Sequence, residues 1–381
     1  MDLELNSEQI ALQQSCKQFA ENEISPYITQ LESENEFRKS LFVRMAKMGF
    51  FNLSVPHLHS RHQYDTVAYA AAVKEISKAD AGIGVTMSVA NMVAESIELF
   101  GTEEQKKRFL KKISGGVSVP LAFALTEKES GSDPKNLKTR ATLDPNDSNY
   151  YIIHGDKQFI TNGDIAGLFI VMARTDEGIT AFIIDELTKG LEVAKRERKM
   201  GLLTVNLCDL HFAGVRVPKA HILGLQNEGL KIAMTSLDSG RIGIAAQAVG
   251  IAEAAYESAL EYAVKRKQFG SFLIEHQAIA FMLANMHVKI NAGTLLLYKA
   301  ARQKDLKKPY TLEASEAKLF CSEMCNEVAS DAVQIHGGYG YVKDNPVERY
   351  FRDARATTLY EGTSEIQRIV ISRQIAKQLQ S

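Results

Sequence analysis

The sequence lacks an excess of charge of either sign. Its 381 residues include 45 Lys and Arg and 46 Asp and Glu, so the formal net charge is −1. Without a basic surplus, the composition predicts neither a nucleic acid nor an anionic membrane as partner. Hydrophobic residues make up 45% and charged residues 24%, the proportions of a soluble globular protein. A chain of this length has room for two or three domains around a large buried core.

Long hydrophobic runs and patterned cysteines are also missing. No apolar run approaches the roughly 18 residues of a membrane-spanning helix, so we expect no membrane span. The first residues, "MDLELNSEQIALQQ", are too acidic and polar for a signal peptide or an Arg-rich transit peptide. Four cysteines without a C-x-x-C pair fit a reducing compartment. We expect a cytoplasmic protein, or a mitochondrial matrix protein if a transit peptide was removed. The cysteines are Cys16, Cys208, Cys321 and Cys325.

Two common nucleotide-binding motifs are absent. The chain has no G-x-x-x-x-G-K-[ST] loop and no strand followed by G-x-G-x-x-G and a helix. The glycines of "HGGYGY", among them Gly337 and Gly338, have another spacing and follow a helix. Their spacing alone favours a helix C-cap over close approach to a ligand phosphate. A Rossmann dinucleotide site is therefore not expected.

No metal site is expected either. His57, His59 and His62 cluster in "HLHSRHQ", but the segment is polar and has no matching cysteine or paired carboxylate. A solvated loop is the favoured interpretation. Cys321 and Cys325, one helical turn apart, are interpreted as core residues.

The pattern of apolar residues predicts three regions and an α+β fold class. Residues 1–120 are helical, beginning with a capping box of Asn6 and Gln9 and including a buried helix that ends at Gly101. Residues 121–225 contain short β-branched and aromatic runs, with a hairpin turning at 176–178. Residues 226–381 contain long helices, the first ending at Gly270, which indicate an up-and-down bundle.

One acidic residue stands apart, in "TTLYEGTSEIQR". Glu361 lies between an aromatic ring and Gly362, with no basic residue beside it. The simple interpretation is an acid before a helix whose capping box runs from Ser364 to Gln367. The functional one is a base, since a partly desolvated carboxyl has a raised pKa. "TEKESGSD", at 126–133, is either a linker or a source of hydroxyl and N–H donors.

Over nearly its whole length the chain resembles the flavin-dependent acyl-CoA dehydrogenases, nearest to their short-chain, butyryl-CoA-type members. The resemblance rests on the order and spacing of "FALTEKESGSD", "DKQFITNG", "RVPKAHILG", "LDSGRIGIAAQAVG", "EHQAIAFMLANM", "QIHGGYGYVKDNPVERYFRDAR" and "LYEGTSEIQ". It implies an N-terminal all-α domain, a middle β-domain and a C-terminal four-helix bundle. It also implies a homotetramer, a dimer of dimers.

The resemblance further implies FAD, held between the middle and C-terminal domains and completed by a second subunit. The residues implied to pack on the flavin, to cover it or to complete its pocket are Phe123, Leu125, Thr126, Ser132, Phe159, Thr161, Thr363 and Glu365. Among them, Thr161 is implied to lie near the flavin N5 atom. Those implied to meet the adenosine or pyrophosphate are Arg266, Phe269, Gln277, Gln334, Gly337 and Gly338. Phe159 departs from the family's usual Trp or Tyr, and "TEKES" from its usual small residues.

The implied reaction is α,β-dehydrogenation of an acyl-CoA thioester to the trans-2-enoyl-CoA. By resemblance Glu361 is the base that removes the α-proton, while the β-hydrogen leaves as a hydride to flavin N5. Such a base works best where water is excluded and donors stabilise the enolate-like oxygen. Some members place the base on the long helix, at or next to Gly240, where this chain has no suitable residue. Implied substrate-binding residues are Ser132, Asp238, Arg241, Gly362 and Arg373.

The sequence therefore predicts an acyl-CoA dehydrogenase for a short or branched acyl chain, which passes its electrons to an electron-transfer flavoprotein. Two alternatives stay open. One is a dehydrogenase for another carrier-bound acyl thioester, such as that of an acyl-carrier protein. The other is a non-catalytic flavin-binding scaffold of the same fold.

Overall fold

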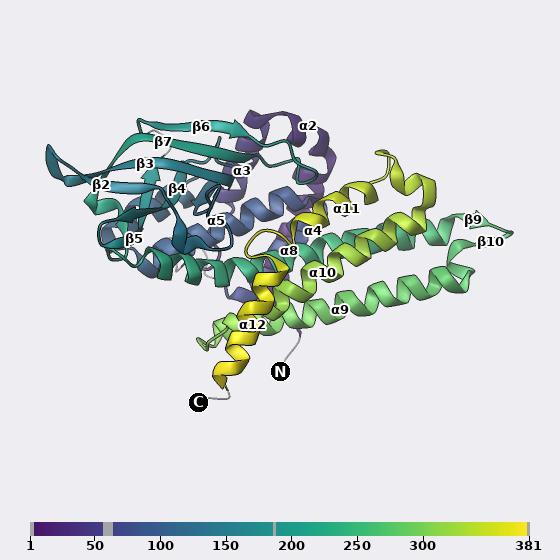
Figure 1. The fold of residues 1–381 in the computed structure, drawn as a ribbon. Coiled ribbons are helices and arrows are strands. Elements are labelled where there is room, and N and C mark those ends of the chain that lie inside the picture. Colours follow the sequence, from purple (N-terminus) through teal and green to yellow (C-terminus); the bar gives the residue numbers. More distant parts are fainter. Residues whose placement is uncertain (1–3, 56–63, 186–187, 379–381) are drawn as a thin grey trace.

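The computed structural model describes residues 4–55, 64–185 and 188–378, and shows a β-sheet region next to a long helical bundle (Figure 1). His57, His59 and His62 lie outside the described residues. The N-terminal helices are α1 (Ser7–Phe19), α2 (Ile28–Ser33), α3 (Asn35–Lys47), α4 (Thr66–Ala79), α5 (Ala81–Phe100), α6 (Glu103–Gln105) and α7 (Lys111–Ser114). The capping box of Asn6 and Gln9 is confirmed at the start of α1.

Helix α5 corrects the expectation that no stretch is long and apolar enough to cross a membrane. Among the described residues, Ala81–Phe100 passes that test by length and composition. Its most apolar window is 78% buried inside the protein, however, as in the core helix of a globular domain. Gly101 follows the helix, and its N–H donates to the Ile97 carbonyl, so the predicted helix end is confirmed.

The middle region forms a mainly antiparallel sheet in the order β6-β7-β3-β2-β4-β5-β8, with β1 parallel to β4. The predicted hairpin at 176–178 is confirmed, since Thr175 pairs with Gly178. Along β4, Leu168 and Ile170 face the main core, while Phe169 and Val171 face a second apolar cluster. The strands are β1 (Leu121–Ala124), β2 (Arg140–Asp144), β3 (Asp147–Thr161), β4 (Leu168–Thr175), β5 (Gly178–Asp185), β6 (Leu191–Arg196), β7 (Leu207–Pro218) and β8 (Ile222–Leu223).

The C-terminal region is helical, with α8 (Gly229–Lys265), α9 (Gln277–Asp305), α10 (Thr311–His336), α11 (Val347–Ala356) and α12 (Ser364–Gln378). The prediction that the first long helix ends at Gly270 is wrong, because α8 ends at Lys265. The next residues form a hairpin of β9 (Lys267–Gln268) and β10 (Ser271–Phe272). Its turn contains Phe269 and Gly270 at φ +54° and +85°, a left-handed backbone that no helix can continue through.

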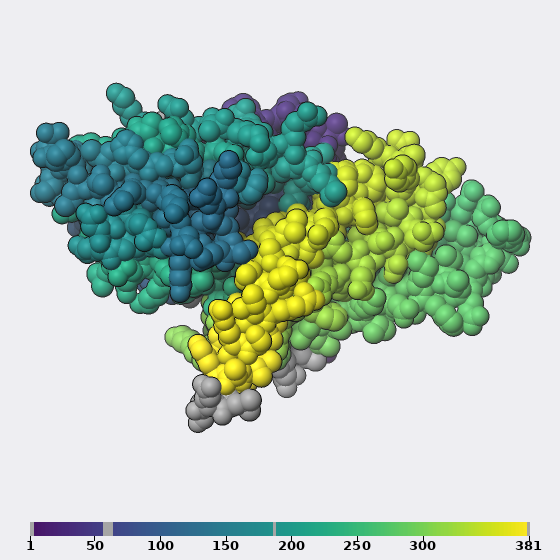
Figure 2. Space-filling view, in the orientation of Figure 1, coloured from purple at the N-terminus to yellow at the C-terminus, as the bar shows by residue number. Residues whose placement is uncertain are grey.

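One continuous core joins the N-terminal helices, one face of the sheet and the bundle. Helix α8 runs through it beside α4, α5, α9 and α10. On the outside, the space-filling view shows α12, in yellow, beside the boundary between the sheet region and the bundle (Figure 2). The α+β fold class with helical, β and helical regions is confirmed, while the domain boundaries at residues 120 and 225 stay predictions.

Candidate active site

Glu361 lies in the segment that joins α11 to α12, at a point where the backbone is left-handed. Its φ is +54°, and that of Gly362 is +87°. A left-handed backbone costs a residue other than glycine roughly 1 kcal/mol or more, so neighbouring contacts must hold it. The structure supplies such contacts from three helices.

Together these contacts anchor three polar groups of this turn. The Tyr360 hydroxyl donates to the Gln247 side chain of α8. The Gly362 carbonyl accepts from Lys318 Nζ of α10, at 2.6 Å, and from Gln367 Nε2 of α12, at 2.9 Å. Gln367 Nε2 also donates to the Glu361 carbonyl, at 3.1 Å. The base candidate is therefore fixed through its backbone and its neighbours.

The prediction that Ser364 is the N-cap of the last helix is wrong by one residue. Ser364 is the first helical residue, and the Ile366 N–H donates to Thr363 Oγ1, at 3.4 Å. Gln367 is turned toward the Glu361–Gly362 turn, where it donates to both carbonyls. The sequence pattern of a capping box is thus used to hold the turn rather than to cap the helix.

The Glu361 carboxyl is partly enclosed, and the residue as a whole is half-buried. Its Oε2 atom is buried and has no hydrogen-bond partner in the described part of the chain. Burial raises the pKa of Glu361 to about 7, while the charges of Arg241 and Lys318 act in the opposite direction. The fold thus supplies two cations that the local sequence lacks. A carboxyl that changes charge near neutral pH can serve as a general base.

Helix α8 passes directly under this carboxyl. A Cβ atom added at Gly240 would lie 2.5 Å from Glu361 Oε2 and 3.1 Å from Met92 Sδ. Glycine is therefore required here for close approach, and a side chain at 240 would occupy the space of the Glu361 carboxyl. Position 240 is where the long-helix base of some family members was expected to map.

Arg241 and Asp238, predicted to bind substrate, form an ion pair on α8. Asp238 Oδ2 also accepts from Thr311 Oγ1, at 2.6 Å, and burial raises the Asp238 pKa. Arg241 Nε is buried without a partner among the described residues. The pair thus lies beside the base candidate, and its contact with the CoA moiety stays a prediction.

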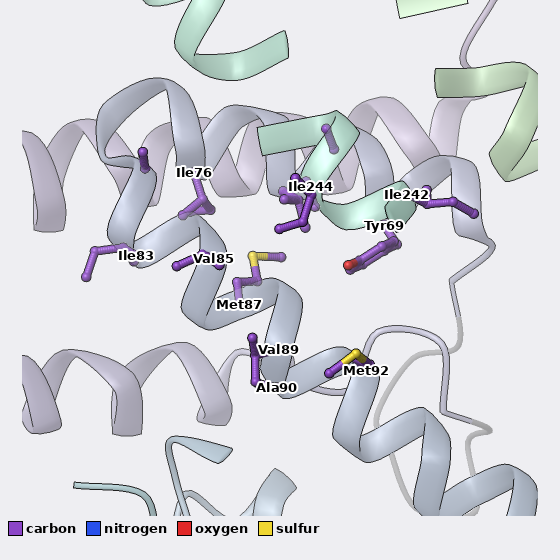
Figure 3. Close-up of a cluster of buried hydrophobic side chains, with 14 of the residues drawn as sticks. Tyr69, Ile76, Ile83, Val85, Met87, Val89, Ala90, Met92, Ile242 and Ile244 are labelled. Atoms are coloured by element: carbon purple, nitrogen blue, oxygen red, sulfur yellow. The ribbon is translucent and has the colours of Figure 1, made fainter. Parts of the chain in front are cut away.

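The other walls near Glu361 are apolar. Figure 3 shows a buried cluster to which α4 contributes Tyr69, α5 contributes Met92 and α8 contributes Ile242. Met92 lies beside Gly240, and Tyr69 is close enough for the Glu361 charge to raise its pKa, together with burial, which is the larger cause. Sequence reasoning missed these two side chains, which come from helices far away along the chain.

The residues predicted to contact the flavin ring lie on β1 and the loop after it, on β3, and at the start of α12. Phe159 is 50% exposed at φ +60°, and its N–H donates to Asp209 Oδ1, at 3.2 Å. The Gln158 N–H donates to the Thr126 carbonyl, at 2.8 Å, so the loop after β1 lies against the end of β3 that carries Phe159. Leu125 is buried, Phe123, Thr126, Thr161 and Thr363 are half-buried, and Ser132 and Glu365 are exposed.

A buried ion pair supports this group. Lys157, which is fully buried, donates from Nζ to Glu127 Oε1, at 2.7 Å, and to the Leu125 carbonyl, at 3.1 Å. Glu127 also accepts from the N–H groups of Lys138 and Thr139. Glu127 in the unusual "TEKES" stretch is therefore an internal residue.

The second predicted group lies at the other end of the bundle. Arg266, Gly337 and Gly338 line a cavity of about 580 Å³ together with Tyr262, His336 and Tyr339. Gly337 caps α10, as its spacing predicted, and its N–H donates to the Gln334 carbonyl. A Cβ added at either glycine would meet nothing within 4 Å, so the backbone faces open space. Phe269 is 96% exposed, and Gln277 and Gln334 are also exposed.

The cavity group is well separated from the base candidate along the bundle. Helix α10 carries Lys318 beside the base candidate and Gln334 beside the cavity. Their separation of 16 positions corresponds to a rise of about 24 Å along the helix. Figure 1 shows the hairpin of β9 and β10 at the end of the bundle away from the sheet. Arg373, predicted to bind substrate, is exposed on α12.

Three family models match successive parts of the chain. They describe the acyl-CoA dehydrogenase N-terminal domain at residues 6–116, the middle domain at 122–215 and the C-terminal domain at 227–376. An acyl-CoA dehydrogenase of Bacillus subtilis is 43% identical over 97% of this chain and 98% of its own length. Subunit CarC of the caffeyl-CoA reductase-Etf complex of Acetobacterium woodii is 42% identical over 95% of this chain and 96% of its own.

The fold agrees with a solved structure as well. Butyryl-CoA dehydrogenase from Megasphaera elsdenii superposes with a TM-score of 0.94. It is 39% identical, and the match covers 99% of this chain and 100% of that chain. The likeness therefore includes all three regions and not only the helical bundle.

Proposed function

The chain belongs to the acyl-CoA dehydrogenase family of oxidoreductases, and from that premise we propose that it catalyses the α,β-dehydrogenation of a short-chain acyl-CoA with Glu361 as the base. The observation that carries the proposal is the buried Glu361 Oε2 without a hydrogen-bond partner in the described residues. An acceptor held free in an apolar pocket is available to take a proton from carbon. A short acyl chain is supported by the likeness to butyryl-CoA dehydrogenase.

Residues around Glu361 prepare it for this step. Burial raises its pKa to about 7, so the ionised form is present at neutral pH and is a stronger base than a solvated carboxylate. The apolar wall of Met92 and Tyr69 excludes water, which strengthens the electrostatic effects inside the site. The Glu361 backbone N–H would donate to the thioester oxygen as negative charge develops there. The positive charge of Arg241, which is buried nearby, would help to stabilise the negative charge on the thioester oxygen.

The chain fits FAD as its cofactor. Gly337 and Gly338 present backbone to open space beside Arg266, which suits a pyrophosphate. Phe123, Thr126, Phe159 and Thr161 would hold the flavin ring near the base. When bound, FAD supplies the acceptor for the electron pair that leaves the β-carbon. Since Arg266 and Phe269 lie at the far end of the bundle, a second subunit would complete each site, which fits a homotetramer.

An electron-transfer flavoprotein is the proposed electron partner. The support is the Acetobacterium woodii relative, which is named as a subunit of a reductase-Etf complex. The same relative supports a second candidate function, in which the chain reduces a 2-enoyl-CoA with electrons from that partner. The proton would then move from Glu361 to the α-carbon.

Anaerobic titration of the purified yellow protein tests both directions. Butyryl-CoA should bleach the flavin absorbance, and Glu361→Gln should keep the colour and lose nearly all bleaching. If the dithionite-reduced protein is instead reoxidised by crotonyl-CoA or cinnamoyl-CoA, and no acyl-CoA bleaches the oxidised form, reduction is the function. If neither direction gives a reaction with any acyl-CoA, the choice lies between the scaffold and another acyl carrier.

A further inference from the structure

Lys318 is a fully buried lysine whose ammonium group forms no ion pair with a carboxylate of the described residues. The residue lies on α10, and its Nζ atom donates to the Gly362 carbonyl, at 2.6 Å. This is the only hydrogen bond of Nζ to the described residues. Buried lysines are uncommon, because removing the charge from water costs several kcal/mol unless a partner compensates. A backbone carbonyl is a weak compensation. The cost is explained if the lysine serves the turn that it contacts.

That turn is the one that carries the base candidate. Glu361 and Gly362 are both left-handed, a backbone that needs support at the first of the two residues. Lys318 and Gln367 both donate to the Gly362 carbonyl, so the peptide plane after the base is held from α10 and α12. Rotation of this plane would swing the Glu361 side chain away from Gly240.

The charges around Lys318 come from three helices and the turn. Glu361 faces it from the turn, Arg241 from α8, Glu323 from α10 and Glu365 from α12. Arg241 is already paired with Asp238 on its own helix. Lys318 is therefore a cation near Glu361 that has no carboxylate of its own within bonding distance in the described part of the chain.

We propose that Lys318 is a positioning residue for the base, which fixes the Gly362 carbonyl and thereby keeps the Glu361 carboxylate aimed over Gly240. This rests on the proposed role of Glu361 as base. Lys318 itself touches no reacting atom. Its effect on the reaction would come through the geometry and charge of the turn.

Three variants separate this role from a general loss of stability. Lys318→Met removes the charge and the donor but keeps the length of the side chain. Lys318→Arg keeps both, and serves as the conservative rescue. Lys74→Met is the matched control, since Lys74 is another buried lysine, on α4, which pairs with Glu253 at 2.9 Å and does not contact the turn.

The first measurement does not depend on substrate. Hydrogen exchange of the peptide that spans residues 357–367, followed by mass spectrometry, should be at least about tenfold faster in Lys318→Met than in wild type. Lys318→Arg should restore at least part of the protection, and Lys74→Met should leave it unchanged. Unchanged exchange in Lys318→Met would overturn the proposal, even if the protein oxidised no acyl-CoA.

The second measurement is the pH profile of butyryl-CoA oxidation. In Lys318→Met, kcat should fall by about tenfold or more while KM changes little, because misplaced groups slow the chemical step. The acid limb of kcat/KM should move to higher pH, since a cation that favours ionised Glu361 is gone. An unshifted acid limb with wild-type kcat would contradict the proposal. If Lys318→Met does not fold, Lys318→Arg still tests it, because that variant must keep at least part of the wild-type protection and an acid limb at the wild-type pH.

Discussion

Glu361 and Gly240 are in direct contact, although they lie 121 positions apart in the chain, and a Cβ at Gly240 would lie 2.5 Å from Glu361 Oε2. The α8 backbone thus packs directly against the carboxyl of the base candidate. Alanine at this position offers a helix propensity gain of about 1 kcal/mol, so any loss of stability must come from the clash. The contact can therefore be measured by a double-mutant cycle.

In that cycle, Gly240→Ala should lower the stability of the wild-type protein by about 1–3 kcal/mol, as overpacking of a buried site does. In the Glu361→Ala background the carboxyl is absent, and the same substitution should be neutral or stabilising. Thermal unfolding of the four proteins gives the coupling. Equal effects of Gly240→Ala in both backgrounds would show that the two residues do not touch.

Replacing Glu361 with glutamine should change how stability depends on pH. The pKa of this carboxyl is raised from 4.5 to about 7 in the folded state, so the stability that it contributes is present below pH 4.5 and lost as the pH rises toward 7. Above pH 7, Glu361→Gln should therefore be more stable than wild type, by on the order of 1–3 kcal/mol. Near pH 5 the difference should be small. Melting temperatures from pH 5 to 9 measure this, and parallel curves would show that Glu361 is solvated.

Loss of one partner of the buried pair of Lys157 and Glu127 should lower the stability of the protein more than loss of both partners. Lys157→Met leaves a buried carboxylate without its cation, a change that costs about 3–5 kcal/mol in comparable cases. The double variant Lys157→Met with Glu127→Gln should recover much of that loss. Chemical denaturation of the two single variants and the double variant gives the free energies of unfolding. Full additivity would indicate that the pair is not coupled.

The sequence predicted the three regions because their periodicities differ strongly. It failed at the end of α8, where "KRKQFG" has helical composition as far as Phe269 but the structure turns a hairpin. Composition does not reveal the left-handed backbone at Phe269. The glycine that follows it, Gly270, is also the residue expected just after the end of a helix, so the sequence is read as a helix that continues to that point. Element boundaries of this kind depend on tertiary contacts.

The candidate base was accessible from the sequence, whereas its support was not. Glu361 is marked by its apolar approach and by the resemblance. Lys318, Met92 and Tyr69 come to it from helices that begin far apart in the chain, and only the fold brings them together. One signal was available: Lys318 shares the helix face of Ala314, Cys321 and Cys325, where a lysine is out of place.

Phe269 gives the sharpest test of a site shared between subunits. The residue is 96% exposed at the turn of the β9–β10 hairpin, and its φ of +54° suits asparagine better than most side chains. Phe269→Asn should therefore keep the hairpin and the fold of the chain, and remove only the exposed ring. If that ring packs on a second subunit's cofactor, the variant should lose FAD on gel filtration at least several-fold faster than wild type.

Flavin absorbance and light scattering on the same column give FAD content and assembly together. Phe281→Asn, a change at another exposed aromatic on α9, controls for loss of apolar surface alone, since Phe281 is 58% exposed and lies outside the predicted cofactor group. The β9–β10 hairpin that carries Phe269 lies at the end of the bundle away from the sheet, so we expect the ring to meet the FAD of a second chain. FAD retention equal to wild type in Phe269→Asn, or a fully flavinated monomer, would therefore refute a site completed by a neighbour.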